Sequence, residues 1–208
     1  MTDQRPPRRV QWRFIASITT LALIWLAMLL GGTGPLDRKV YEALYAGDRP
    51  ALAATAHVLT ALGEPTVLIA ATVLCALWLW YMGRARLGLT LLVIAMLGRA
   101  LSEVQKYWIG RDRPDLEAHL VVVKTRSFPS GHANSSMIFY LAVALALTAG
   151  TRWERPAAAA AVLLSLLVGT SRVMLGVHWP SDVIGGWAFG LLWVLLTLKP
   201  AERLLRAT

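Results

Sequence analysis

A histidine and an aspartate in the C-terminal third of the chain stand at a spacing suited to nucleophilic catalysis. His178 and Asp182 are four positions apart, which on a helix places both side chains on one face, about 5–6 Å apart at Cβ. A carboxylate in that position accepts a hydrogen bond from one imidazole nitrogen and leaves the other neutral and nucleophilic. His132 supplies a second imidazole, able to protonate a leaving group. Two histidines in opposite protonation states suit nucleophile and acid chemistry near neutral pH.

Three basic side chains accompany these groups. Lys106 and Arg113 belong to the segment KYWIGRDRP, and Arg172 belongs to SRVMLGVHWPSD. The two guanidiniums can bind phosphate oxygens bidentately. Ser130 adds a hydroxyl donor, and Gly131, without a Cβ, lets the backbone approach an anion closely. We expect a helix to begin near Gly131 and to direct its free N–H groups at that anion.

The remaining polar residues fit this pattern less well. Arg99 and Glu103 form an i,i+4 pair, which we expect to support Lys106 rather than to act on a substrate. No cluster of carboxylates is suited to Mg²⁺, so neither a metal nor another cofactor is predicted. We interpret the other histidines, His57 and His119, as structural or solvated. Lys124 and Arg126 precede the PSGH segment and either recruit an anionic lipid or lie in a solvated loop.

Composition places these groups in a membrane protein. Hydrophobic residues make up 56% of the 208 residues, with a mean hydropathy of +0.54, more apolar surface than a soluble domain of this size can bury. A helix needs about 20 apolar residues to cross a bilayer. Six uncharged stretches approach this length: 14–36, 65–83, 87–98, 133–151, 156–171 and 183–198. We expect the third of them to continue to about Trp108. The shorter segment 51–63 is expected to form an interfacial or re-entrant helix.

The distribution of basic residues predicts the orientation. With the N-terminus inside, the inner segments carry eleven Lys or Arg against three acids: 1–13, 84–86, 152–155 and 199–208. Cytoplasmic loops are enriched in this way, so both termini are predicted to be cytoplasmic. By parity the loops at 103–132 and 170–182 share the outer face, where the polar residues can converge. The same bias explains the formal charge of +9, and no nucleic acid partner is predicted.

One domain accounts for the whole chain. We predict an all-α, polytopic membrane protein with six transmembrane helices: a cytoplasmic arm at 1–13, a membrane domain at 14–198 and a cytoplasmic tail at 199–208. The first span ends in Gly31-Gly32-Thr33-Gly34 without a signal-peptidase pattern, so we read it as an uncleaved anchor. The single cysteine, Cys75, allows no disulfide framework.

The polar residues closely resemble the motifs of the type 2 phosphatidic acid phosphatase (PAP2) superfamily. These motifs are K-x6-RP, PSGH and SR-x5-H-x3-D, and all eleven fixed positions match, at 106–114, 129–132 and 171–182. The resemblance implies that His178 is phosphorylated, that Asp182 orients it, and that His132 protonates the leaving group and then activates water. It also implies phosphate binding and transition-state stabilisation, without a metal, by Lys106, Arg113, Ser130, Gly131 and Arg172.

The implied function is hydrolysis of a lipid phosphate monoester or diphosphate, with the bilayer and the lipid as partners. Phosphatidic acid, phosphatidylglycerol phosphate, undecaprenyl diphosphate and lipid A phosphates all fit, and we place undecaprenyl diphosphate and phosphatidate first. Single-domain size and the basic inner hairpins suggest a bacterial inner membrane enzyme with a periplasmic site. The sequence does not predict an oligomeric state.

Two other functions stay open. Vanadium-dependent haloperoxidases share these motifs because vanadate mimics a phosphorane, but they are soluble and larger, and six spans argue against them. An anion channel or phospholipid transporter can use the same cationic cluster. Such a protein has no need of the pair formed by His178 and Asp182, nor of a second imidazole.

Overall fold

The described part of the chain is a bundle of α-helices. The computed structural model describes residues 8–206, with side chains for 12–198. The ends of the predicted arm and tail, 1–7 and 207–208, lie outside the described residues. All regular structure within 8–206 is helical: α1 (Arg8–Gly31), α2 (Pro35–Leu44), α3 (Pro50–Ala61), α4 (Pro65–Tyr81), α5 (Ala85–Ile109), α6 (Gly131–Thr148), α7 (Glu154–Met174) and α8 (Pro180–Arg206). The all-α prediction is confirmed, and α1 and α8 extend into the predicted arm and tail.

Helical segments of membrane-spanning length dominate the bundle. Five segments in the described part of the chain are long and apolar enough to cross a bilayer: Trp12–Gly31, Pro50–Tyr81, Ala85–Ile109, Glu154–Met174 and Pro180–Leu198. Helix α6 is not among them, and its first turns carry the polar residues His132, Asn134 and Ser136. It nevertheless packs against α5, α7 and α8 in the middle of the bundle.

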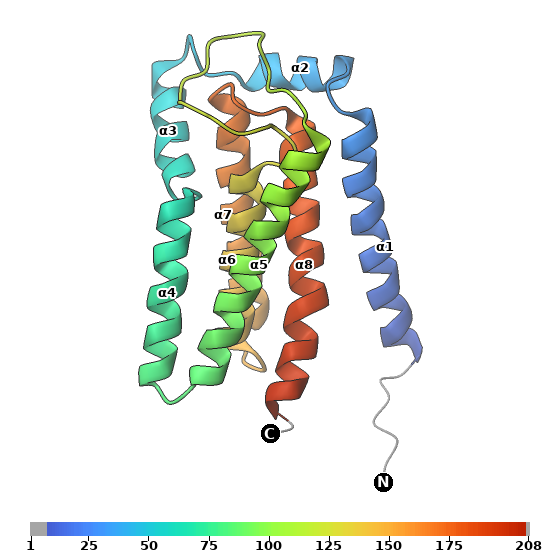
Figure 1. The fold of residues 1–208 in the computed structure, drawn as a ribbon, viewed down its shortest axis with the longest axis vertical. Helices are drawn as coiled ribbons and strands as arrows, with labels where there is room; N and C mark the ends of the chain where they lie inside the picture. The colour runs from blue at the N-terminus through green and yellow to red at the C-terminus, as the bar shows by residue number, and fades with distance from the viewer. Residues whose placement is uncertain (1–7, 207–208) are drawn as a thin grey trace.

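Segment 51–63 differs from its predicted role as a separate interfacial or re-entrant helix. It forms α3, which stands end to end with α4 (Figure 1), and the two together make one 32-residue apolar segment. The helix breaks between them at Leu62–Glu64, and α4 begins with Pro65. Proline has no N–H to donate and is suited to a first helical position. The break therefore interrupts the helix, while the apolar segment continues from α3 into α4.

Glycines on α8 let it approach α6 closely. A Cβ added at Gly186 would lie 2.8 Å from the carbonyl oxygen of Ser130, and one at Gly190 would lie 2.9 Å from that of Asn134. Small residues at helix contacts in membranes allow such approaches. Because Ser130 is the N-cap residue of α6 and belongs to the PSGH motif, this packing brings the second and third motifs together. Below them, side chains of α5, α6 and α8 form the main apolar core, including Leu91, Ile138 and Val194.

A short helix that the sequence did not predict crosses the outer end of the bundle. Helix α2 lies roughly perpendicular to the other helices (Figure 1). The Asp37 carboxylate accepts hydrogen bonds from the backbone N–H of Ser181, at 2.9 Å, and from its hydroxyl. Tyr41 is fully buried and its ring centroid lies 5.9 Å from that of Trp179. Helix α2 therefore fixes the start of α8.

The two motif-bearing loops lie at the same end of the bundle. The α5–α6 loop (110–130) and the α7–α8 loop (175–179) are at the end where α2 crosses, whereas the start of α1, the end of α8 and the α4–α5 turn lie at the opposite end (Figure 1). The expectation that these loops share one face, away from the termini, agrees with this arrangement.

Candidate active site

The three motifs meet around one cavity. Its volume is about 240 Å³, and its lining includes Lys106, Arg113, Gly131, His132, Arg172 and His178. The other two predicted site residues, Ser130 and Asp182, are completely buried behind this lining. All eight residues predicted from the sequence are therefore gathered at one place, from α5, the α5–α6 loop, α6, α7, the α7–α8 loop and the start of α8.

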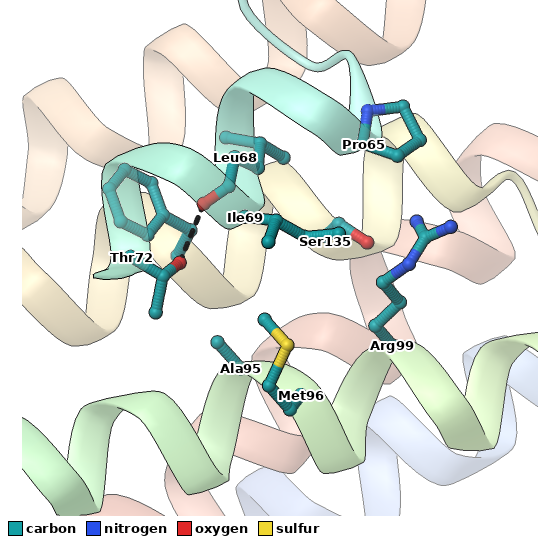
Figure 2. Close-up of a pocket in the computed structure, with 9 residues that line it drawn as sticks. Pro65, Leu68, Ile69, Thr72, Ala95, Met96, Arg99 and Ser135 are labelled. Atoms are coloured by element: carbon teal, nitrogen blue, oxygen red, sulfur yellow. Dashed lines mark hydrogen bonds between the residues drawn. The ribbon is translucent and has the colours of Figure 1, made fainter. Parts of the chain in front are cut away.

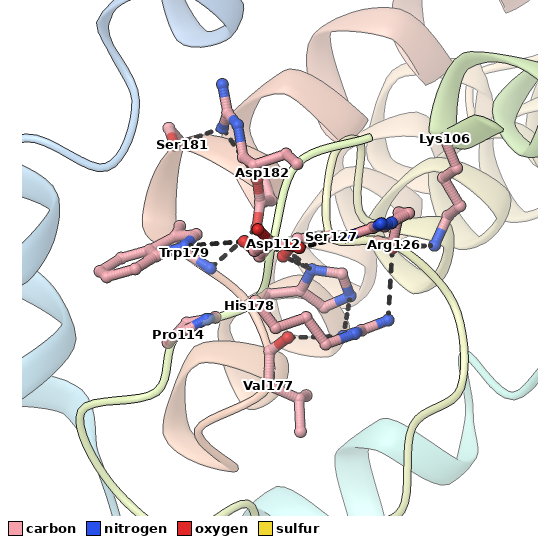
Figure 3. Close-up of polar contacts among 12 residues, drawn as sticks. Lys106, Asp112, Pro114, Arg126, Ser127, Val177, His178, Trp179, Ser181 and Asp182 are labelled. Carbon is pink, nitrogen blue, oxygen red and sulfur yellow. Dashed lines mark hydrogen bonds and ion pairs between the residues drawn. The ribbon is translucent and has the colours of Figure 1, made fainter. Parts of the chain in front are cut away.

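The Asp182 carboxylate anchors His178, although the two do not share a helix. Helix α8 begins at Pro180, so His178 lies just before it, and the expectation that both residues sit on one helix face is wrong. The contact still forms, with Nδ1 of His178 3.3 Å from Oδ2 of Asp182 (Figure 3). Asp182 also accepts the backbone N–H of Trp179 at 2.9 Å and the hydroxyl of Ser127. The carboxylate is thus fixed from several sides.

The other ring nitrogen of His178, Nε2, lies at the cavity wall and carries a lone pair rather than a proton. The Nη1 of Arg113 lies 3.2 Å from Nε2 of His178, and because a guanidinium can only donate, Nε2 must accept. The ring proton then sits on Nδ1, facing Asp182. Burial, followed by the positive charges of Arg113 and Lys106, lowers the pKa of His178 well below its ordinary value. The imidazole is therefore neutral near pH 7, and the lone pair of its Nε2 is directed at Arg113 and the cavity.

The cationic residues are held in place by neutral oxygen atoms rather than by carboxylates. Lys106 donates to the carbonyl of Arg126 at 3.2 Å, and Arg113 donates to the carbonyl of Thr125 at 2.8 Å. Arg172 donates to the hydroxyl of Thr60 at 2.7 Å. Neutral acceptors position a cation without cancelling its charge. The positive charge of the cavity thus remains for an anionic ligand.

Two buried polar groups and a helix end add further donors. Among the described residues, the hydroxyl of Ser130 and Nε of Arg172 are buried without a hydrogen-bond partner, an arrangement that is rare in folded proteins. The first hydrogen bond of α6 joins the N–H of Asn134 to the carbonyl of Ser130 at 3.0 Å. The preceding N–H groups at the helix start have no intrahelical acceptor, which is the usual basis of an anion site.

Sequence reasoning missed Arg111, which lies between the fixed positions of the first motif. Its Nη1 donates to Oδ1 of Asp182 at 2.8 Å, and its Nη2 donates to the carbonyls of Met28 and Leu29 at 2.9 and 2.7 Å. The guanidinium lies over the ring of Phe128, 4.4 Å from its centroid. This side chain ties the catalytic carboxylate to the end of α1. The only sequence signal is a third basic residue within the first motif, 106–114, and it does not indicate which way the side chain points.

Further ionisable residues line the cavity beyond those predicted. Arg99 and Glu103 form the expected i,i+4 ion pair at 4.0 Å, and both face the cavity, as does Lys124. Glu64, which the sequence did not single out, lies 3.2 Å from Nε2 of His132. His57 is exposed on α3, and His119 contacts the carbonyl of Pro114 at 2.7 Å. In the described part of the chain no group of three or more His, Cys, Asp or Glu is placed to hold a metal ion.

Comparison with known proteins decides the family. The model of the PAP2 superfamily matches residues 87–204. The chain belongs to the PAP2 superfamily. Phosphatidylglycerophosphatase B of Bacillus subtilis is 32% identical over 174 residues, which are 82% of this chain and 85% of that protein. Lipid A 1-phosphatase of Rhizobium etli is 31% identical over 223 residues, covering 92% and 85%.

A solved structure agrees with this membership. The crystal structure of a transmembrane PAP2-type phosphatidylglycerolphosphate phosphatase from Bacillus subtilis matches with a TM-score of 0.82 at 30% identity, covering 90% of this chain and 96% of that one. The predicted family and the predicted activity, an integral membrane phosphatase acting on lipid phosphates, are confirmed.

Proposed function

We propose that this PAP2 enzyme transfers the terminal phosphate of a membrane lipid to Nε2 of His178 and then to water. The observation that carries the proposal is the placement of the His178 imidazole. Asp182 holds it through Nδ1, and its Nε2 faces the cavity beside Arg113. Lys106 and Arg172 complete the positive lining. These side chains would neutralise the charge that develops on the equatorial phosphate oxygens in the transition state.

The first half-reaction forms a phosphohistidine. Nε2 of His178 attacks phosphorus, the bond from phosphorus to the lipid oxygen breaks, and its electron pair stays on the departing oxygen. His132, which lines the same cavity, donates a proton to that oxygen. The lipid leaves as an alcohol, or as a lipid monophosphate when the substrate is a diphosphate. The Asp182 carboxylate stabilises the positive charge gained by the imidazole.

The second half-reaction restores the enzyme. Water attacks phosphorus and gives a proton to His132, which thereby regains the proton it lost. The bond between phosphorus and Nε2 of His178 breaks, its electron pair returns to nitrogen, and inorganic phosphate leaves. Protons balance over the cycle without any further reactant. The expectation that no metal takes part remains a prediction for an assay in EDTA.

A small apolar groove beside the phosphate cavity supports a lipid as the substrate. It lies between α4, α5 and α6 (Figure 2) and is lined by Pro65, Leu68, Ile69, Thr72, Ala95, Met96, Arg99, Ser135 and Phe139. Pro65 and Arg99 line both spaces. The Thr72 hydroxyl donates a hydrogen bond to the carbonyl of Leu68 at 2.7 Å. It therefore adds no unpaired polar group to this largely apolar wall. The volume of this hollow is only about 20 Å³, so we infer that the head group occupies the cavity and that the hydrocarbon chain passes this apolar wall on its way to the bilayer.

Phosphatidylglycerol phosphate is the substrate that the similarities favour, because the B. subtilis relative and the matching crystal structure both bear that activity in their names. Phosphatidate carries the same monoester chemistry. Undecaprenyl diphosphate is a second candidate, because Arg99 and Lys124 line the cavity in addition to the three motif cations. The positive charge of Lys124 suits a second phosphate, whereas that of Arg99 is offset by its ion pair with Glu103.

We propose that α6 is a membrane helix in addition to the five candidate segments, which gives six spans. The basic hairpin residues Arg84, Arg86, Arg152 and Arg155 support cytoplasmic placement of that end of the bundle and of both termini. The cavity would then face the periplasm of a bacterial inner membrane. Residues 14–198 form the phosphatase domain in this proposal, between the arm 1–13 and the tail 199–208.

The test is release of inorganic phosphate by the purified protein in detergent and EDTA. The panel contains phosphatidylglycerol phosphate, phosphatidate, undecaprenyl diphosphate and lipid A. We expect turnover of at least one lipid, abolished in His178→Ala and retained in His57→Ala, a control that removes an exposed imidazole from α3. Absence of phosphate release from every lipid, or full turnover by His178→Ala, contradicts the proposal.

A further inference from the structure

The cavity contains a second carboxylate–imidazole pair in addition to Asp182 and His178. Glu64 precedes α4, and its Oε2 lies 3.2 Å from Nε2 of His132. We propose that Glu64 is a positioning residue that orients His132 and keeps it protonated for transfer to the leaving oxygen. This inference rests on the proposed function, in which His132 is the acid. It assigns a role to a residue outside the three motifs.

The direction of the Glu64 carboxylate supports a role toward His132 rather than toward its own helix. Glu64 is the N-cap residue of α4, but within the described side chains it makes no capping hydrogen bond to the first turn. A residue at this position commonly uses its side chain to accept an N–H of that turn. Here the carboxylate turns to the imidazole of α6 instead. Helix capping therefore does not explain its conformation.

The turn that carries Glu64 is pressed against the His132 ring. The hydroxyl of Tyr140, on α6, donates to the carbonyl of Leu62 at 2.8 Å. A Cβ added at Gly63 would lie 2.3 Å from Cγ1 of Val168 and 3.2 Å from Cδ2 of His132. The break between α3 and α4 is thus fixed against α6 and α7. This packing brings a carboxylate 68 positions earlier in the chain to the ring.

The Glu64 carboxylate is a negative charge next to an imidazole that is otherwise surrounded by positively charged groups. The groups that face the ring from other elements are Arg172 on α7, Lys106 on α5, and Arg113 and His178 in the two loops. Burial of the ring is the largest influence against a proton on His132, and these groups, which carry positive charge or can acquire it, add to it. Glu64 is in direct contact and has the opposite sign. An adjacent negative charge favours the protonated imidazole.

Glu103 is the other carboxylate of the cavity, and it serves a different partner. Its Oε1 is 3.9 Å from a Cβ built on Gly131 and 4.0 Å from Nη2 of Arg99. It lies beside the phosphate donors and pairs with a cation. Replacing Glu103 therefore removes the same charge from the same cavity while leaving the contact between Glu64 and His132 intact.

The two histidines are held through opposite nitrogens. Asp182 engages Nδ1 of His178 and leaves Nε2 for phosphorus. Glu64 accepts from Nε2–H of His132, which leaves Nδ1–H to give its proton to the leaving oxygen. One carboxylate thus supports a neutral nucleophile and the other a protonated acid, within the same cavity.

The experiment compares Glu64→Gln, Glu64→Asp and Glu103→Gln with the wild-type enzyme on dioctanoyl phosphatidate, as kcat/KM across pH 5 to 9. A general acid must be protonated, so activity falls as pH rises through its pKa, and loss of the adjacent carboxylate moves that fall to lower pH. Because half of the Glu64 side chain is exposed to solvent, we expect a moderate effect. Glu64→Gln should lower kcat/KM about 10-fold at pH 7, mainly through kcat, and shift the basic limb by about one pH unit.

The other two variants separate charge from packing. Glu64→Asp should recover most of the activity and the wild-type basic limb, whereas Glu103→Gln should leave the basic limb in place. With p-nitrophenyl phosphate, whose leaving group needs no proton at neutral pH, Glu64→Gln should change kcat/KM less than about twofold.

Several results would overturn the inference while leaving the proposed function intact. The first is an unshifted basic limb in Glu64→Gln when the wild-type enzyme is active and His178→Ala is not. An equal loss on both substrates, or the same shift in Glu103→Gln, would show that Glu64 acts through structure or general charge. Inactivity of the wild-type enzyme on every lipid would instead refute the function itself.

Discussion

Arg111 offers a sharp test of how the catalytic carboxylate is held, and Arg111→Met is the informative replacement. Methionine has a similar length but carries no charge and no donor. The guanidinium, with only 10% of its side chain exposed, forms an ion pair with Asp182 at 2.8 Å. It also donates to Ser181 and to two carbonyls at the end of α1. The replacement leaves Asp182 buried without its ionic partner.

The magnitude follows from this burial. Breaking one side of a buried ion pair costs about 3–5 kcal/mol because the remaining charge stays desolvated. For a chain of this length that corresponds to a decrease in Tm on the order of 10 °C. Activity should fall less than in a nucleophile variant, by about 10- to 100-fold, because Ser127 and the backbone of Trp179 still hold the carboxylate.

The assay combines thermal unfolding in detergent with kcat/KM on the preferred lipid. The matched control is Arg126→Met, which removes an arginine from the same loop. Its guanidinium pairs with Asp112, and both side chains are largely exposed, at 57% and 86%. A surface pair of this kind contributes about 0–1 kcal/mol, so Tm should hardly change.

Coupling to Asp182 is the decisive part of this prediction. In the double variant Arg111→Met with Asp182→Asn, the loss of stability should be smaller than the sum of the two single losses, because both remove the same ion pair. Equal Tm values for Arg111→Met and Arg126→Met would refute the reasoning. So would strictly additive effects in the double variant.

Three further predictions follow from the site. Asp182→Asn should lower kcat/KM by about 10²–10⁴-fold, because an amide cannot hold Nδ1–H of His178 as a carboxylate does. Steady-state kinetics measure this loss. Because the lowered pKa of His178 keeps the ring neutral in mild acid, the acid limb of the wild-type kcat/KM profile should lie below pH 6.5. In Arg113→Gln a cation that lowers this pKa is missing, so the acid limb should move to higher pH. A pH series on both enzymes checks it, and an acid limb above pH 6.5 in the wild type would contradict it. Gly186→Ala should lower Tm and activity together, because its Cβ would meet the carbonyl of Ser130 at 2.8 Å, and normal values for both would contradict that packing.

Much of this architecture could be predicted from local sequence patterns. Long uncharged stretches identify the membrane helices because a bilayer imposes length and apolarity on each span. The eight predicted site residues could be placed on one face because alternating helices bring every second loop to the same end. The helix start at Gly131 was predictable because the PSGH motif directly precedes a long uncharged stretch.

The features that escaped prediction depend on tertiary contacts. Helix α2 has only 10 residues and a largely polar sequence, so its position depends on the burial of Tyr41 and on the contact from Asp37 to Ser181. The inward direction of Arg111 is set by carbonyls at the end of α1. Glu64 reaches His132 only because α3 and α4 break where they do.

The central claim is that phosphate passes through Nε2 of His178, and trapping of the intermediate tests it most directly. The enzyme is mixed with lipid labelled with ³²P in its terminal phosphate, quenched in alkali after milliseconds, and digested for mapping of the labelled residue. We predict an acid-labile, alkali-stable label on His178 that is absent from His178→Ala and unchanged in His57→Ala. Label on any other residue, or lipid turnover by His178→Ala at the wild-type rate, would contradict the claim.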